Sequence, residues 1–425
     1  MRFERYIAQR FLPNGRGEYS RSLVAIATAS IALGVLVMVT AICILRGFQG
    51  EIRGKVVGFG SHIVVQSFQM GAPSSGAGAI YESVTPVDVT RPELQSLRQH
   101  RNVRHVQRYA SKGGMVKTPD QIYGIILKGV DAQFDTAFFA HYLCQGRMPH
   151  FTDLQSSSPV SNEIIISQTI ADRLRIGLGD KLRTYFWIGD AAAPQSLPYR
   201  ARAFEICGIY STDLTDFDDH FIIGDLRVVQ RLNNWDSTLV DGYEVLLDDF
   251  THLDRTAQEL NQLLPYDLTL TTIIQQNPAL FSWLDLLDSN IILIIFIMIL
   301  VCIVAILSAL LIMIFEKTST IGLLKALGAT NRHIRTIFLY KSASIILTGI
   351  AIGDALAAVL CGLQWRYHLI ALDSESYSMS SVPVDFNPYI FLFVSVGTFV
   401  VCLLALLLPT AYIARIHPAK TIRFE

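Results

Sequence analysis

Residue types that often carry enzymatic chemistry are present, but no catalytic arrangement of them is. The 425-residue sequence holds no GxxxxGK[ST] phosphate loop, no GxSxG nucleophile motif and no HExxH zinc motif. Gly76 and Gly78 stand in a polar loop and not between a strand and a helix, so they do not indicate a nucleotide site. The ten histidines are scattered and no Cys/His spacing suggests zinc. We therefore expect no enzyme, no metal and no cofactor bound by this chain.

An acidic cluster is the nearest approach to a cation site. Its members are Asp213, Asp216, Asp218 and Asp219. Their spacing does not match a calcium-binding loop. The cluster therefore predicts a solvated turn between strands, with cation binding as the less favoured alternative.

One carboxylate, Asp354, falls inside a long apolar run. A carboxylate at the centre of a membrane span costs roughly 2.5–3.5 kcal/mol on insertion scales. We expect an inter-helix hydrogen bond or a position near the outer interface, and a proton relay is the less favoured reading. Gly349, Gly353 and Ala357 form a small-xxx-small ridge in the same run, which suits close helix contact.

The elements around these residues indicate a membrane protein. The mean hydropathy is +0.38 and 51% of the residues are hydrophobic. The apolar residues are concentrated in the runs 22–45, 290–315, 342–363 and 389–413. Each run supplies the roughly 20 residues that cross about 30 Å of hydrocarbon as a helix. The first run is long and no small-x-small cleavage site follows it, so it predicts an uncleaved signal anchor.

The distribution of charge sets the expected orientation. The formal net charge is only −1, but Lys and Arg gather before the first span, between the second and third spans, and after the fourth. Short loops rich in Lys and Arg stay cytoplasmic. The expected order is an amphipathic cytoplasmic segment 1–21, span 22–45, a periplasmic domain 46–289, span 290–315, a cytoplasmic loop 316–341, span 342–363, a periplasmic loop 364–388, span 389–413 and a cytoplasmic tail 414–425. The predicted location is a cell inner membrane with both termini inside.

The segment 46–289 is expected to be a large α+β domain, and it has room for two subdomains. Runs rich in Ile, Val, Tyr and Phe and bounded by Gly, Asp or Pro predict strands, and helical periodicity predicts helices between them. The predicted strands are 62–68, 122–130, 163–167, 181–188, 204–210, 220–224 and 243–247, and the helices are 168–176, 226–232 and 251–264.

Six cysteines divide between two environments. Those at 43, 302, 361 and 402 lie in the spans and should behave as small apolar residues. Cys144 and Cys207 fall in the outer domain, where a disulfide can persist. Two cysteines without diagnostic spacing favour free thiols, with a disulfide between them as the alternative.

The loop between the second and third spans carries the most specific pattern. It reads EKTSTIGLLKALGATNRHIRTIFLYKS and resembles the signature loop of FtsX/MacB-type ABC-transporter permeases. The matching residues are Glu316, Ile321, Gly322, Leu323, Leu324, Lys325, Ala326, Leu327, Gly328 and Ala329. In that family the segment forms a helix that docks into a groove on the ATPase subunit. An amphipathic helix here would offer Ile321, Leu324 and Leu327 to such a groove. Gly328 is suited to end it.

Other segments resemble the lipoprotein-releasing branch of this family, LolC and LolE. They are 45–65, 146–149, 163–182, 208–232 and 416–424, and Arg46 stands where the family usually has Asn. The resemblance covers nearly the whole chain. It implies four transmembrane helices plus a large α+β periplasmic domain of the MacB/LolC type. It also implies a permease subunit that extracts lipoproteins from the inner membrane and passes them to a periplasmic carrier.

The resemblance also places two candidate sites. The hook-like loop to which the carrier docks corresponds to WIGDAAAPQSLPY, and its candidate contacts are Trp187, Ile188, Pro194, Leu197, Pro198 and Tyr199. Its composition departs from that of known hooks, so a plain hairpin loop is the alternative. Lipoproteins are expected to enter between the first span of one subunit and the second span of another. The predicted lining is Val39, Ile42, Phe48, Ile291, Ile295 and Ile299, although any lipid-facing helix is equally apolar.

Partners follow from the same resemblance. Four spans cannot enclose a lipidated substrate, so a second permease subunit, identical or paralogous, is required. The other expected partners are two ABC ATPase subunits that hold ATP–Mg, a periplasmic carrier, the lipoproteins and membrane lipid, without nucleic acid. Two alternatives remain: a MacB-like efflux permease, which often carries its ATPase on the same chain, and an FtsX-like regulator of a periplasmic hydrolase, whose outer domain is usually smaller.

Overall fold

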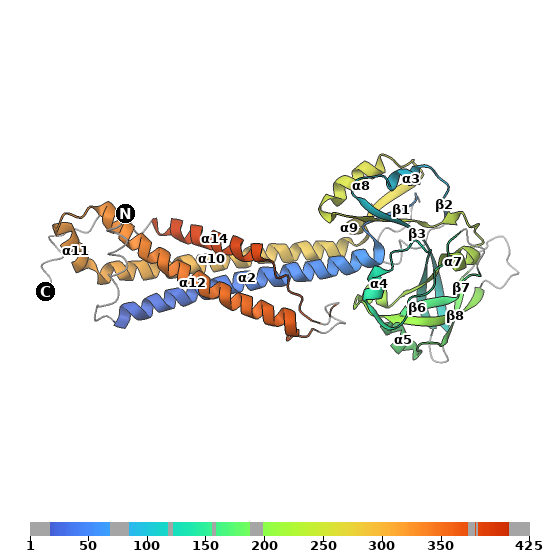
Figure 1. Ribbon diagram of the computed structural model, residues 1–425, viewed down its shortest axis with the longest axis horizontal. Coiled ribbons are helices and arrows are strands. Elements are labelled where there is room, and N and C mark those ends of the chain that lie inside the picture. Colours follow the sequence, from blue (N-terminus) through green and yellow to red (C-terminus); the bar gives the residue numbers. More distant parts are fainter. Residues whose placement is uncertain are drawn as a thin grey trace. The chain divides into compact units, whose positions relative to one another are not determined.

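The computed structural model describes residues 18–68, 85–117, 122–154, 159–187, 199–372, 379 and 381–407 (Figure 1). The chain divides into two compact units. We call residues 1–50, 284–371 and 381–425 the membrane unit, and residues 51–283 and 372–380 the β domain. Most of the predicted segment 1–21 and all of the predicted tail 414–425 lie outside the described residues.

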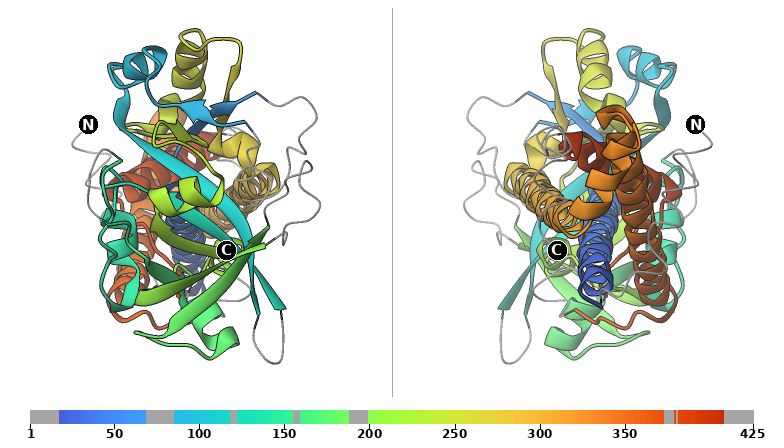
Figure 2. Two further views of the ribbon diagram at one scale, coloured as in Figure 1. Left: turned by 90° about the vertical axis from the view of Figure 1, so that its right-hand side faces the viewer. Right: turned by 90° about the vertical axis from the view of Figure 1, so that its left-hand side faces the viewer.

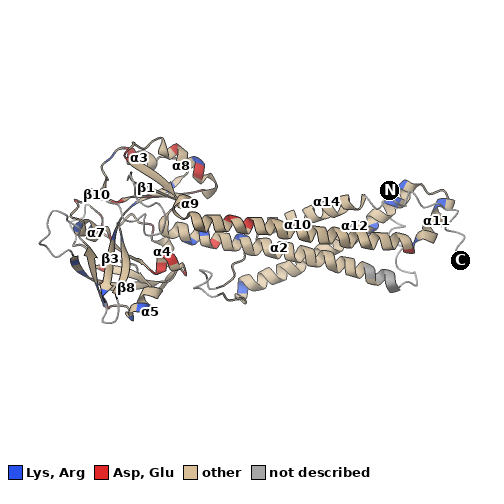
Figure 3. Ribbon diagram, turned by 180° about the vertical axis from the view of Figure 1, so that it is seen from behind, with Lys and Arg blue, Asp and Glu red and all other residues tan. Residues whose placement is uncertain are grey.

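Within the described residues, four helices are long and apolar enough to cross a membrane. They are α2 (Glu18–Gly60), α10 (Pro278–Glu316), α12 (Asn331–Tyr367) and α14 (Pro388–Ala405), and α11 (Thr318–Ala326) lies between α10 and α12. Charged residues are sparse along most of their length (Figure 3). Three of these helices extend beyond the predicted spans; α2, for example, continues past residue 45 to Gly60. Hydropathy marks where an apolar run ends, whereas a helix continues until its backbone is capped.

The membrane helices pack around one apolar cluster, and Figure 2 shows them as a bundle seen along its length. The predicted small-residue ridge on α12 packs against α2. A Cβ atom added to Gly349 would lie 2.9 Å from Cβ of Ile31, and one added to Gly353 would lie 2.9 Å from Cβ of Val35. Real Cβ atoms do not approach so closely, so only glycine permits this helix separation. The predicted close helix contact is confirmed.

The β domain contains twelve strands among its described residues. The strands are β1 (Ile63–Ser67), β2 (Val87–Asp88), β3 (Val103–Lys117), β4 (Ile122–Val130), β5 (Leu143–Gly146), β6 (Glu163–Ser167), β7 (Lys181–Trp187), β8 (Tyr199–Tyr210), β9 (Phe221–Asp225), β10 (Leu239–Val240), β11 (Gly242–Leu247) and β12 (Leu268–Thr272). The helices are α3 (Glu93–Leu97), α4 (Ala137–His141), α5 (Gln168–Leu174), α6 (Thr215–Asp218), α7 (Leu226–Leu232), η2 (Phe250–His252), α8 (Leu253–Asn261) and α9 (Ile273–Gln276).

Strand pairing divides this domain into a barrel and an arm. The strands β3, β4, β9, β6, β8 and β7 pair in that order, and β7 pairs again with β3, which closes a six-stranded barrel. The arm is the antiparallel series β12, β1, β11 and β3. The 15-residue strand β3 belongs to both, since residues 103–109 pair with β11 and residues 114–116 pair with β7. The barrel and the arm are thus the two subdomains for which the sequence indicated sufficient length.

Local sequence patterns predicted the first and last residues of some of these elements correctly. The strands β4 and β6 and the helix α7 have the predicted bounds. Side chains cap the N-termini of α5 and α7: Ser167 accepts from the backbone N–H of Ile170, and Asp225 accepts from that of Arg227. The strands β2, β3, β5, β10 and β12 were not predicted.

Candidate coupling and docking sites

The helix α11 ends as the sequence predicts. Gly328 has a φ of +92°, the left-handed conformation that glycine adopts without strain. Its N–H donates to the Lys325 carbonyl at 3.0 Å, and the Ala329 N–H donates to the Leu324 carbonyl at 2.9 Å. These two bonds form a Schellman motif. This turn at Gly328 ends α11, so the residues after it do not belong to the helix.

The face of α11 that points outward differs from the predicted one. Ile321 is fully buried and joins the apolar cluster of the membrane unit, together with Ile314 and Ile334. Leu323 and Leu327 are 58% and 77% exposed, and Leu324 is half-buried. The prediction that Ile321 faces a partner groove is therefore wrong for this conformation, because α11 uses that residue to pack on its own bundle. The exposed apolar pair, four residues apart, lies on one helix face.

The remaining signature residues are placed around this pair. Glu316 ends α10, with its carboxylate 3.7 Å from the Lys317 ammonium. Gly322 is buried beside Ile321, and Lys325 is half-buried. Ala326 and Gly328 are exposed, and Ala329 packs against the apolar cluster.

The second candidate site is the hairpin formed by β7 and β8. Trp187 ends β7, Tyr199 begins β8, and the two residues are paired in register. Their ring centroids are 5.2 Å apart at 75°, and the side chains are 53% and 43% exposed. The other candidate contacts, Ile188, Pro194, Leu197 and Pro198, lie outside the described residues. What the structure shows is an exposed aromatic pair at the base of the loop.

An arginine fixes the end of this hairpin that adjoins the loop. Arg200, next to Tyr199, donates from Nη1 to the carbonyl of Arg231 at 2.9 Å and to Oδ1 of Asn234 at 2.8 Å. A third, longer contact reaches the Leu232 carbonyl at 3.5 Å. These acceptors lie at and just beyond the C-terminal end of α7, where carbonyl groups lack intrahelical partners. Nothing in the sequence indicated this anchor, because the two segments are distant along the chain.

The predicted lipoprotein path lies mostly inside the bundle. Val39 is fully buried in the apolar cluster, and Ile42, Ile295 and Ile299 pack against that cluster. Phe48 and Ile291 are half-buried. Residues of α2 and α10 thus pack in one cluster within a single chain, where Val39 lines no open surface. The path between the first span of one subunit and the second span of another stays a prediction. The exposed apolar side chains of α10 are others, including Ile292, Phe296 and Leu300.

Asp354 makes the expected inter-helix hydrogen bond. Ser395 of α14 donates from its hydroxyl to Oδ2 of Asp354 at 2.6 Å. This bond gives the carboxylate a partner on the neighbouring helix, which reduces the cost of its position within the apolar segment.

The acidic cluster is structural. Asp218 is buried and accepts from the Thr212 N–H at 2.9 Å and the Thr212 hydroxyl at 2.7 Å. Asp219 pairs with Arg173 at 3.0 Å, and Asp213 lies 3.7 Å from the buried Lys55 ammonium. The prediction of a solvated turn is wrong for Asp218, which folds inward. Among the described residues, no group of three or more His, Cys, Asp or Glu side chains is arranged to hold a metal. Cys144 and Cys207 are free thiols.

A buried carboxylate joins the arm to the barrel. Asp241, just before β11, accepts from the N–H of Ser111 at 2.5 Å and from its hydroxyl at 2.8 Å, while its own N–H donates to the Tyr109 carbonyl at 3.1 Å. Burial raises the pKa of Asp241 to about 7, and burial also raises the pKa of Asp218 to about 6.

These shifts predict that the β domain becomes more stable as the pH falls from 7 to 5. The unfolded carboxyls lose their protons near pH 4, whereas the folded ones keep them to higher pH, so the folded state binds more protons in this window. Stability should therefore decrease as the pH rises through about 4 to 7. Thermal unfolding of the full chain at pH 5 and pH 7 measures the effect. Asp241→Asn should remove part of the difference, and an unchanged difference would contradict the assignment to Asp241.

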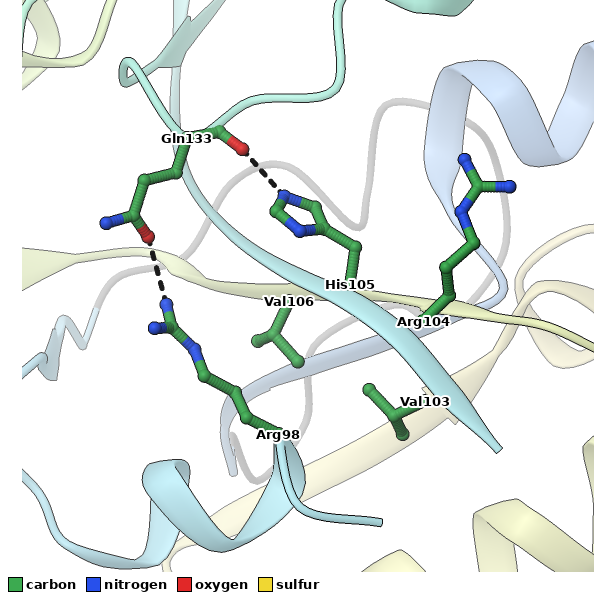
Figure 4. Close-up of a pocket in the computed structure, with 6 residues that line it drawn as sticks. All are labelled: Arg98, Val103, Arg104, His105, Val106 and Gln133. Carbon is green, nitrogen blue, oxygen red and sulfur yellow. Dashed lines mark hydrogen bonds between the residues drawn. The ribbon is translucent and has the colours of Figure 1, made fainter. Parts of the chain in front are cut away.

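A pocket of about 310 Å³ opens beside the start of β3 (Figure 4). Gln133 organises it: its Oε1 accepts from Arg98 at 3.0 Å, and its main-chain carbonyl lies 2.6 Å from Nε2 of His105. Arg104 pairs with Asp135 at 2.9 Å. These contacts tie residues 133–135 to the arm. None of the predicted site residues lines this pocket.

Comparison with known families identifies the architecture. Residues 24–263, more than half of the chain, match the MacB-like periplasmic core domain, and residues 292–418 match the FtsX-like permease C-terminal region. The chain belongs to the FtsX/MacB-type permease family. Members are non-catalytic transmembrane subunits that pair with an ABC ATPase. The permease is thus a multi-pass membrane protein with a periplasmic-type domain.

Several curated relatives resemble the permease over its full length. The lipoprotein-releasing system transmembrane protein LolC of Xylella fastidiosa is 21% identical, covering 99% of this chain and 98% of the relative. LolC of Neisseria meningitidis is 22% identical and covers 99% of both chains. LolE of Haemophilus influenzae is 21% identical and covers 96% of both.

Solved structures resemble the permease over about half of its length. The extracellular domain of the noncanonic ABC-type transporter YknZ covers 49% of this chain and 99% of its own, at 14% identity and a TM-score of 0.31. The periplasmic region of MacB from Actinobacillus actinomycetemcomitans covers 51% and 92%, at 12% identity and a TM-score of 0.32.

Proposed function

We propose that this permease is a subunit of an ABC transporter that extracts lipoproteins from the inner membrane and passes them to a periplasmic carrier. The observation that carries the proposal is the match to proteins named as lipoprotein-releasing subunits along essentially the whole of both chains. A separate ATPase subunit, present in two copies with ATP–Mg, drives the cycle. Because four helices are too few to enclose a lipidated substrate, a second permease subunit completes the assembly.

The orientation belongs to the proposal. The clusters of Lys and Arg before α2, in the loop that holds α11, and after α14 favour the cytoplasmic side for those segments. Both termini are then cytoplasmic, and the β domain is periplasmic. Leu323 and Leu327 would meet the ATPase on the inside, and Trp187 and Tyr199 would meet the carrier on the outside.

Two connections support a transmission of movement. The helix α11 is joined to α10 by Lys317 alone, and its Ile321 is packed in the cluster that α12 shares. The helix α2 is unbroken from Glu18 to Gly60, and its last ten residues belong to the β domain. A displacement of α11 by the ATPase would therefore shift the bundle, and a tilt of α2 would reach the β domain through continuous helix.

Depletion of the permease tests the proposed function. Lipoproteins should then accumulate in the inner membrane, and purified permease with its ATPase should release them from proteoliposomes only when ATP and a periplasmic carrier are both present. Normal lipoprotein release after depletion would overturn the proposal. Loss of drug efflux or of cell-wall hydrolase activity instead would favour the MacB-like or the FtsX-like alternative.

The aromatic pair provides a specific test of carrier docking. Replacing Trp187 and Tyr199 together by alanine should weaken carrier binding at least about tenfold, because exposed aromatic anchors often contribute more than 1 kcal/mol each to an interface. Titration of the carrier against the full-length protein measures the change. The matched control is Tyr266→Ala, an almost fully exposed tyrosine before β12. If the double variant and the control bind the carrier with equal affinity, the hairpin is not part of the docking site.

A further inference from the structure

Two cysteines of the membrane unit face each other across the contact between α2 and α12. Cys43 and Cys361 are both buried, and their thiols share a hydrogen bond. They are free thiols in the structure. Neither the proposed transport function nor the helix packing described so far requires a sulfur atom at these two positions.

The register of the two helices explains why these residues meet. Gly349 lies against Ile31, and Gly353 lies against Val35. In both pairs the α12 number exceeds the α2 number by 318, and Cys361 and Cys43 continue the series with the same difference. They lie eight residues beyond the second pair, about 12 Å along each helix at 1.5 Å per residue. A constant difference over three pairs means that the helices run parallel in one register.

The helix separation is suited to a covalent link. At both glycine positions the Cβ–Cβ distance would be 2.9 Å. A disulfide requires Cβ atoms about 3.5–4.5 Å apart. The helices therefore need to be only slightly farther apart at Cys43 and Cys361 than at the glycines, and the two thiols are close enough to interact.

The residues that pack around Cys43 favour a disulfide at this position along α2. The Cys43 carbonyl accepts from the Asp385 N–H at 3.0 Å, and a Cβ on Gly47 would lie 2.7 Å from the Pro383 carbonyl oxygen. The segment that leads into α14 thus packs against α2 beside Cys43. In the proposed orientation this end of the bundle is the periplasmic end, where disulfides persist.

We propose that Cys43 and Cys361 form a disulfide that links α2 to α12 near the periplasmic face; this inference rests on the orientation given in the proposed function. The oxidant is a protein disulfide of the outer compartment. One cysteine thiolate attacks it, which gives a mixed disulfide and releases one thiol of the oxidant. The second cysteine thiolate then displaces the other thiol, so two S–H bonds are lost, one S–S bond forms and the oxidant leaves as a dithiol. Exchange precedes the final packing of the helices, because both thiols are buried afterwards.

Differential alkylation of the full-length protein in its native membrane tests this link. Cells are quenched in acid, and free thiols are blocked with N-ethylmaleimide under denaturing conditions. The protein is then reduced, and the released thiols take an isotopically heavy maleimide before peptide mass spectrometry. Cys43 and Cys361 should carry the heavy label, whereas Cys302 of α10 should carry the light one. In the Cys43→Ser variant, Cys361 should change to the light label.

Two results would overturn the link. The first is light label on both Cys43 and Cys361 in the wild-type protein. The second is heavy label on Cys361 that persists in Cys43→Ser, which would mean a different partner. Lipoprotein release is measured separately in the same strains. If the disulfide is absent but lipoprotein release still depends on the permease, only the disulfide is refuted. If the disulfide is present but lipoproteins are released normally after depletion of the permease, only the proposed function is refuted.

Discussion

Replacing Leu327 by glutamate should separate the permease from its ATPase. Leu327 is the most exposed apolar residue of the α11 region, and Leu323 continues the same face. A carboxylate in an apolar groove loses its hydration without gaining a partner, which disfavours docking by several kcal/mol. We expect ATP-dependent lipoprotein release to fall at least about tenfold and the ATPase to be lost on purification.

The same substitution should leave the permease folded. Leu327 caps α11, and an acidic side chain near a helix C-terminus costs only about 0.3–1 kcal/mol. Leu263→Glu, at another exposed leucine in the β domain, is the matched control and should keep both the ATPase and release. Co-purification of the ATPase with Leu327→Glu at the wild-type ratio would show that this face does not dock. Ile321→Glu is unsuitable, because a charge there would be buried in the bundle.

The second large effect is expected at a buried ion pair in the β domain. The Lys128 ammonium lies 2.5 Å from Oε1 of Glu244, and both side chains are fully buried. Lys128 also donates to the Phe59 carbonyl at 2.8 Å, and Gln107 donates to Oε2 of Glu244 at 2.8 Å. Phe59 lies in the last turn of α2, where carbonyl groups lack helical partners. The pair therefore holds the end of α2 to the strands β4 and β11.

Lys128→Met should destabilise the β domain by about 3–5 kcal/mol, because it leaves a buried carboxylate without its cation. Protease resistance and thermal unfolding of the full-length protein measure the loss. The double variant Lys128→Met, Glu244→Gln should recover much of it, since the amide needs no counter-ion and its oxygen still accepts from Gln107. Lys181→Met, at an exposed lysine of β7, is the control. Equal stability of Lys128→Met and the control would contradict the prediction that this ion pair stabilises the β domain.

The sequence predicted best the features that depend on local composition. Four apolar runs are enough to identify four membrane helices, because a bilayer selects for length and hydropathy alone. The strand β4 was predicted with its bounds because Ile, Tyr and Val fill it, and Gly328 marked the end of α11 because a left-handed residue favours glycine. The signature loop likewise led to the family.

Features that depend on distant partners were not predicted. The strand β3 reads VRHVQRYASKGGMVK, and its polar residues give no alternation because its two halves pair in different surroundings, the arm and the barrel. The burial of Lys128 depends on Glu244, which lies on another strand, and on the end of α2. The outward face of α11 was predicted wrongly at Ile321, since which face of an amphipathic helix is free depends on where its own bundle packs.

The shared strand β3 has a mechanical consequence. Its first half is hydrogen-bonded to β11 and its second half to β4 and β7, so it is the one strand, among those described, that is paired in both the arm and the barrel. A force that draws the arm away along β3 would load many of these hydrogen bonds at once, in shear, and not one after another as in peeling. A closed barrel offers no free edge at which such peeling could start. The β domain is thus built to carry tension along β3 with little extension, and to yield more readily to forces across the strand.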